Sequence, residues 1–74
     1  MLLKNYSEER IKEYKELDYN YELIHATEKN YVYKMNHNMR MITFYIVFYL
    51  CENIPYGTVY SENKYKEIEN NLSI

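Results

Sequence analysis

The feature that most constrains this fold is a long apolar segment in the middle of a very short chain. From Met41 to Cys51, only Thr43 interrupts a run of apolar and aromatic side chains. Residues 42–49 are β-branched or aromatic throughout, which favours a strand. The run is long for a strand, so a central buried helix over residues 39–53 is the alternative. The run is too short for a bilayer-spanning helix, which needs about 20 apolar residues.

Helical periodicity predicts one helix before this segment and one after it. Apolar residues recur at helical spacing in both places: Ile11, Tyr14 and Leu17 near the start, and Tyr65, Ile68 and Leu72 near the end. We expect the first helix to span about residues 7–17, with Asn5 or Ser7 as its N-cap. We expect the second helix to begin after an N-cap at Ser61.

Between the first helix and the apolar segment, the hydrophobic period changes to two. The alternating residues are Tyr19, Tyr21, Leu23 and His25, followed by Tyr31, Tyr33 and Met35. Two such runs joined by a short polar loop predict a β-hairpin. A second turn at residues 36–38 leads into a third strand. The predicted fold class is therefore α+β, with the order helix, three-stranded antiparallel sheet, helix, in a single domain of residues 1–74. Residues 58–60 add a short extended piece.

The predicted packing leaves an apolar surplus. In simple register Leu23 lies opposite Tyr33, and Tyr33 lies opposite Met41. The odd-numbered side chains, including Met39, then share one face of the sheet, which is suited to receive both helices. The third strand is apolar on both faces, and such a strand must be covered on both. We expect the two helices to cover only one face, and a second copy or a partner protein to cover the other. The predicted partner-binding or dimer interface consists of Ile42, Phe44, Tyr45, Ile46, Phe48 and Tyr49. A central helix wrapped by the chain would remove this reason for an interface.

No residue pattern points to catalysis, a metal or a cofactor. His25, His37 and Cys51 are isolated, without the short ligand pairs of zinc sites. Cys51 ends an apolar run, where thiols are usually inert packing groups. A single glycine excludes a glycine-rich phosphate loop. We therefore expect a protein that is not an enzyme and holds no cofactor.

Charge and residue usage narrow the function classes. Nine basic and 11 acidic residues give a formal net charge of −2, which argues against a dedicated DNA-binding protein. The predicted topology is similar to that of the double-stranded-RNA-binding domain, but residues 61–64 lack the basic helix start of that domain. Base stacking on Tyr31 and Tyr33 keeps a small nucleic-acid-binding regulator as the alternative function. A lone cysteine favours a reducing, intracellular setting.

The function predicted from these features is a non-enzymatic protein–protein interaction module. Eleven tyrosines suit an interface, and the frequent Asn, Lys, Tyr and Ile residues have AT-rich codons. Small chains of this kind are common among phage and mobile-element products, and the expected fold is similar to that of some anti-CRISPR proteins. We predict an inhibitor that binds and blocks a host nucleic-acid-processing protein in the cytoplasm, forms a homo-oligomer and does not contact a membrane.

Overall fold

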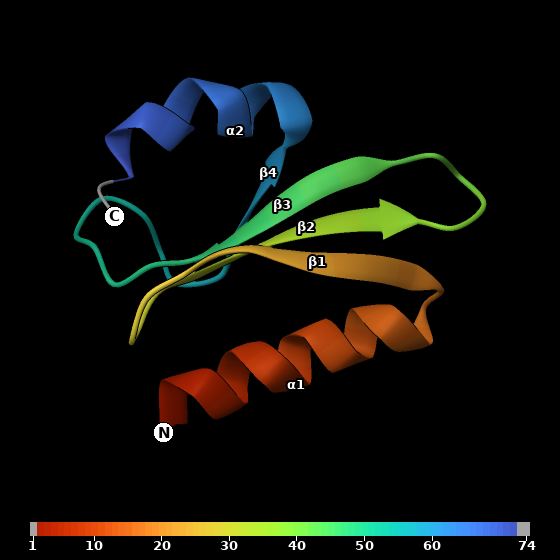
Figure 1. The fold of residues 1–74 in the computed structure, drawn as a ribbon, viewed down its shortest axis with the longest axis horizontal. Helices are drawn as coiled ribbons and strands as arrows, with labels where there is room; N and C mark the ends of the chain where they lie inside the picture. The colour runs from red at the N-terminus through yellow and green to blue at the C-terminus, as the bar shows by residue number, and fades with distance from the viewer. Residues whose placement is uncertain (1, 73–74) are drawn as a thin grey trace.

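The computed structural model describes residues 2–72 and shows an α+β fold with a four-stranded antiparallel sheet (Figure 1). The elements, in chain order, are α1 (Leu2–Glu16), β1 (Tyr19–Ala26), β2 (Tyr31–His37), β3 (Thr43–Phe48), β4 (Thr58–Ser61), α2 (Glu62–Ile68) and the 3₁₀ turn η1 (Glu69–Asn71). The strands lie in the sheet in sequence order. The predicted class is confirmed at this level, but the sheet has a fourth strand because residues 58–61 pair with β3. The central-helix alternative is wrong, since residues 43–48 form a strand.

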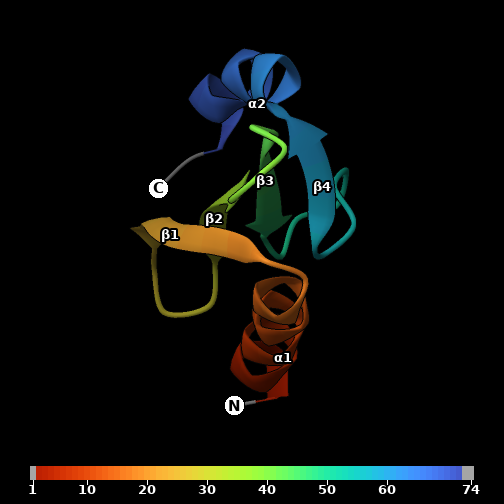
Figure 2. The same cartoon turned by 90° about the vertical axis from the view of Figure 1, so that its right-hand side faces the viewer.

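The two helices lie on opposite faces of the sheet (Figure 2). On the α1 face, Ile11 and the partly buried Tyr14 pack against sheet residues that include Met35, Ile46 and Phe48. On the α2 face, the residues in contact with the sheet are Tyr65, Ile68 and Leu72, as the helical spacing predicted. Each helix therefore covers one side of a shared sheet, and the core consists of two layers separated by the strands.

This arrangement corrects the expected burial of the apolar segment. Successive side chains of β3 point to opposite faces, so Ile46 and Phe48 enter the α1 layer while Tyr45 and Val47 enter the α2 layer. All four are buried. The expectation that a strand apolar on both faces must be covered on both is confirmed. The expectation that two helices would cover only one face is wrong, because the chain places one helix on each.

The register between β2 and β3 also differs from the predicted one. Leu23 lies opposite Tyr33 as expected, but Tyr33 pairs with Ile46 and not with Met41. The hairpin loop covers residues 38–42 and is closed by a hydrogen bond from His37 N to Ile42 O of 3.0 Å. The partner of Tyr33 therefore moves by five positions, from 41 to 46. An odd shift exchanges the two faces of a strand, which brings the even-numbered residues of β3 onto the α1 face.

The helix ends test the predicted N-caps. Ser61 caps α2, and its hydroxyl oxygen accepts a hydrogen bond from Lys64 N at 3.3 Å. Asn5 and Ser7 lie within α1, which begins earlier than predicted, so the expected caps are wrong. Ser7 is buried on the inner side of the helix. The helical spacing predicts the amphipathic stripe correctly, but α1 begins about five residues earlier than the predicted start at residue 7.

Candidate protein-binding surfaces

The predicted interface residues lie mostly inside the molecule. Tyr45, Ile46, Phe48 and Tyr49 are buried by the chain itself, and Phe44 is partly buried against the α1 layer. Ile42 is exposed and lies in the loop before β3. The structure therefore does not gather these six residues on one surface, and only Ile42 is open to a partner.

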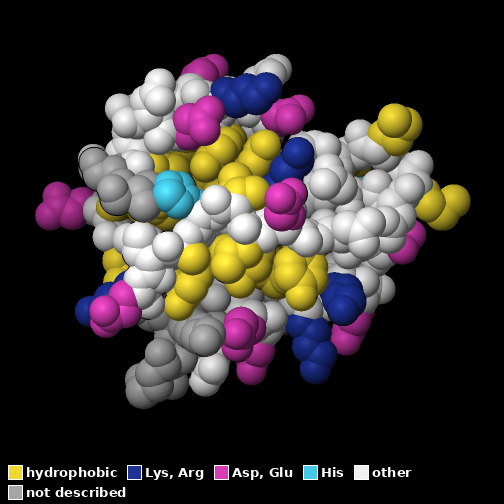
Figure 3. Space-filling view, in the orientation of Figure 1, with side chains coloured by type: hydrophobic (Ala, Val, Ile, Leu, Met, Phe, Trp, Pro, Cys, Tyr) yellow, Lys and Arg dark blue, Asp and Glu magenta, His cyan; other side chains and the backbone are white. Residues whose placement is uncertain are grey.

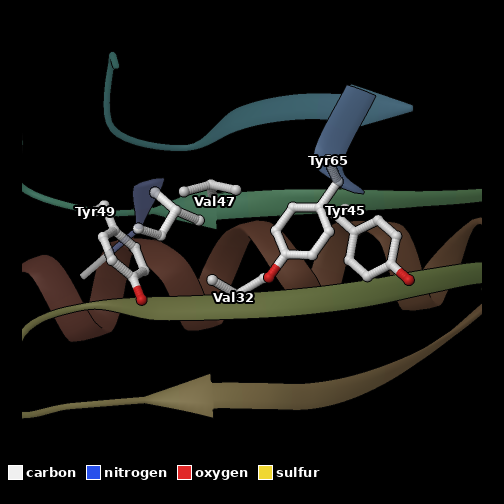
Figure 4. Packing of buried hydrophobic residues seen from close by; sticks show 6 residues of the cluster. Val32, Tyr45, Val47, Tyr49 and Tyr65 are labelled. Carbon is white, nitrogen blue, oxygen red and sulfur yellow. The ribbon is translucent and has the colours of Figure 1, made fainter. Parts of the chain in front are cut away.

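The buried aromatic residues of β3 hold the two layers together. Tyr45 stacks on Tyr65 of α2, with ring centroids 4.1 Å apart and planes inclined by 11° (Figure 4). Burial raises the pKa of both hydroxyl groups above the usual value of 10.0. Phe48 meets Tyr33 and Tyr56 edge to face, with centroids 5.9 and 5.4 Å apart. These contacts are those of a core, and they give β3 a structural role.

Exposed apolar side chains gather instead at one end of the sheet. We define the tip surface as the exposed apolar residues of the β2–β3 loop together with the residue that follows α1: Leu17, Met39, Met41 and Ile42. Met39 is 81% exposed and Met41 93% exposed. In Figure 3, hydrophobic side chains project at the right-hand end of the molecule, where this loop lies in Figure 1. The predicted face that puts both methionines under the helices is therefore wrong.

The backbone beneath the tip surface is held by a local hydrogen-bond network. His37 Nδ1 accepts hydrogen bonds from Met39 N and Arg40 N, each at 3.1 Å. Asn38 donates through its side-chain amide to Asp18 Oδ1 at 2.7 Å, and its backbone N donates to Asp18 O at 3.1 Å. The Asn20 side chain donates to Asn38 Oδ1. The loop is therefore tied to the start of β1, although its methionine side chains extend into solvent.

The tip surface was missed because its residues resemble those of a strand. Met39 and Met41 alternate with polar residues and run directly into the apolar segment, so the pattern predicts that the third strand begins immediately after the turn at residues 36–38. Within this predicted turn, His37 has a structural role, because its ring nitrogen organises the loop. The Asn-His-Asn sequence at residues 36–38 indicated a turn, but no pattern in the sequence showed that the loop continues to Ile42.

A second open region lies along β1. Tyr21 and Leu23 are 46% and 47% exposed, and an open groove of about 580 Å³ separates Tyr21 from α1. Lys12, Lys15, Glu8 and Glu16 of α1 line this groove, so its rim carries both signs of charge. Figure 3 shows hydrophobic side chains on this face, where β1 lies in Figure 1.

Tyr31 and Tyr33, the pair predicted to stack on nucleic-acid bases, are less accessible to solvent than that prediction requires. Tyr33 is buried between Tyr21 and Phe48, with ring centroids 5.9 Å from each. Its burial raises the pKa of the hydroxyl above 10.0, and the Glu8 carboxylate adds to the shift. Tyr31 is partly buried, and its hydroxyl donates to Glu28 O at 3.2 Å. A base could not stack on Tyr33 without displacing core side chains.

The side chains that could bind a metal or act as nucleophiles do not cluster in the described part of the chain. Within residues 2–72, no three side chains among His, Cys, Asp and Glu come together as a possible metal site. Cys51 is exposed, with its thiol 4.0 Å from the backbone oxygen of Ile54. The nearby Tyr49 hydroxyl is buried without a hydrogen-bond partner, and burial raises its pKa above 10.0. In the same part of the chain, neither helix has the length and apolar character to cross a bilayer.

No protein-family model matches the sequence, and neither the curated proteins nor the solved structures include a significant match.

Proposed function

We propose that this chain is a non-enzymatic protein–protein interaction module that binds its partner through the tip surface. The observation that carries the proposal is the exposure of Met39 and Met41 on a loop whose backbone donates hydrogen bonds to Asp18 O, just before β1, and to His37 Nδ1 in β2. Methionine side chains adapt to irregular apolar surfaces and are frequent at binding surfaces. Burial of each would contribute about 1.5–3 kcal/mol.

The order of the loop adds to this argument. A partner that binds a disordered segment must offset the entropy lost when the segment becomes ordered. Here the hydrogen bonds from Met39 N and Arg40 N to His37, and from Asn38 to Asp18, already define the path of the backbone. Binding at the tip surface would therefore order mainly the side chains of Met39 and Met41.

We extend the proposal to an inhibitor that binds and blocks a host nucleic-acid-processing protein, as phage and mobile-element products do. The extension is supported by the small size of the chain and by its AT-rich residue usage. A net charge of −2 is too small for DNA mimicry, so the expected mode is an apolar loop that fills a groove of the target.

The test is photo-crosslinking with photo-methionine in place of methionine, in extracts of the native host. Met35 is fully buried and serves as an internal control, because its crosslinks should stay within the chain. We expect a partner peptide attached at position 39 or 41. An excess of unlabelled wild-type protein should abolish the crosslink, and an excess of the Met39→Ser/Met41→Ser variant should not.

A Leu50→Ser variant is the matched competitor, since Leu50 is an exposed apolar residue outside the tip surface. It should compete as well as the wild-type protein does. Equal competition by the double serine variant would contradict the proposal. Crosslinks to nucleic acid that weaken steeply as salt rises would instead support the regulator hypothesis.

A further inference from the structure

The sheet has one long free edge. β1 has eight residues and pairs only with β2, whereas the opposite edge strand, β4, has four residues. Most residues of β1 are exposed, among them Tyr21, Leu23 and Ile24. A long, exposed, partly apolar edge strand is a template for pairing with another strand.

The hydrogen bonds identify which backbone groups of β1 face outward. Residues that exchange hydrogen bonds alternate along an antiparallel pair. The bond from Asn38 N to Asp18 O therefore assigns Asn20 and Glu22, two and four positions further along β1, to the bonded positions facing β2. The bond from His37 N to Ile42 O agrees, because it turns the odd-numbered residues of β2 toward β3. The N–H and C=O groups of Tyr19, Tyr21 and Leu23 therefore point away from the sheet.

Two backbone irregularities limit this free edge. Asp18 has a φ of 73° and cannot continue the strand. At the other end, the register shifts between Leu23 and His25, so that Ile24 forms a bulge. Bulges bend a strand and interrupt regular pairing. The regular edge therefore runs from Tyr19 to Leu23, with Tyr21 at its centre.

We infer that this edge pairs with the same edge of a second copy of the chain, antiparallel, about a two-fold axis at Tyr21. In this register Tyr21 lies opposite Tyr21 of the second copy, and Tyr19 lies opposite Leu23. These are the residues whose backbone groups point outward, so each pair exchanges hydrogen bonds. The whole regular edge of one copy is then matched by the whole edge of the other. This surface is separate from the tip surface, so either proposal can fail without the other.

The side chains select this register over its neighbours. On the α1 face the two copies bring together apolar residues: Tyr19, Tyr21 and Leu23 from each. On the opposite face, Glu22 lies beside Asn20 of the second copy. If the register shifts so that Tyr21 pairs with Leu23 of the second copy, Glu22 lies opposite Glu22, and like charges directly opposite are destabilising. If the register shifts so that Tyr21 pairs with Tyr19 of the second copy, Leu23 has no partner, because the residue opposite it lies before Asp18 and outside the strand. The groove beside Tyr21 is lined by both acidic and basic residues of α1, so we expect no strong charge repulsion between the two copies there.

The first experiment uses the native chain. We expect sedimentation velocity to show a reversible dimer as concentration rises from micromolar to millimolar. Over the same range, amide exchange at Tyr19, Tyr21 and Leu23 should slow, while exchange at Asn20 and Glu22, already bonded to β2, should not change. A Tyr21→Pro variant removes one outward N–H from each copy, which edge strands tolerate. The dimer loses two hydrogen bonds at its axis and should weaken about thirtyfold.

The second experiment traps the register in a Cys51→Ser background. Tyr21→Cys should form a disulfide-linked dimer, because directly opposite residues of a bonded pair have Cα atoms about 5.5 Å apart. Leu23→Cys is the matched control, with nearly the same exposure on the same face, and should remain a monomer. A chain that stays monomeric at millimolar concentration, or a dimer that crosslinks equally at position 23 or at neither position, overturns the inference.

Discussion

Truncation of Phe48 separates the role of β3 in the core from a role in association. Phe48 is fully buried and its ring meets the rings of Tyr6, Tyr33 and Tyr56 at centroid distances of 5.4–6.2 Å. Phe→Ala substitutions in cores cost about 3–5 kcal/mol. Because the cavity would lie between β3 and α1, where three aromatic neighbours lose a packing partner, we expect a loss of about 4 kcal/mol. A chain of 74 residues has a total stability of about 4–11 kcal/mol.

The assay is urea and thermal unfolding followed by far-ultraviolet circular dichroism. A loss of about 4 kcal/mol lowers the melting temperature by about 16–32 °C in a domain of this size. Phe44→Ala is the matched control, because Phe44 is the other phenylalanine of the chain and is only partly buried. We expect it to cost about half as much. A loss below about 1 kcal/mol for Phe48→Ala, with weaker self-association instead, would refute the assignment of Phe48 to the core.

Three further substitutions or conditions test the packing. Gly57 has a φ of 83°, and a Cβ there would displace Arg10 Nη1, which donates to Gly57 O at 2.7 Å. Gly57→Ala should therefore lower the free energy of unfolding by about 1–2 kcal/mol, and an unchanged melting temperature would contradict this. A double-mutant cycle of Tyr45→Leu and Tyr65→Leu should give a coupling of about 0.5–1.5 kcal/mol, because the rings are stacked; additive losses would show that the stack contributes nothing. Burial raises the pKa of five tyrosines above 10.0, namely Tyr33, Tyr45, Tyr49, Tyr56 and Tyr65. Above this pH the unfolded chain releases protons that the native chain keeps, so the free energy of unfolding should fall with rising pH. Tyrosinate absorbance should rise together with unfolding, and a titration complete near pH 10 in the folded chain would contradict the prediction.

Local patterns determined the elements that depend on local physics. The alternation from Tyr19 onward predicts the first hairpin, and the pairing of Leu23 with Tyr33 follows from it. Ser61 was recognised as the cap of α2 because a hydroxyl at that position satisfies a free backbone N–H. The need to cover both faces of residues 43–48 also followed from the sequence alone, since both sets of alternating side chains are apolar.

The tertiary structure alone decided what covers those faces and which residues remain open. The faces of β3 depend on the length of the loop before it, and a shift of one residue exchanges them. Met39 and Met41 are as apolar as strand residues, so composition cannot locate the start of β3. Only the closed hairpin, with His37 bonded to Ile42, turns β3 so that α1 and α2 each bury one of its faces. The same closure moves the exposed apolar surface from β3 to the tip of the hairpin and leaves β1 as the free edge.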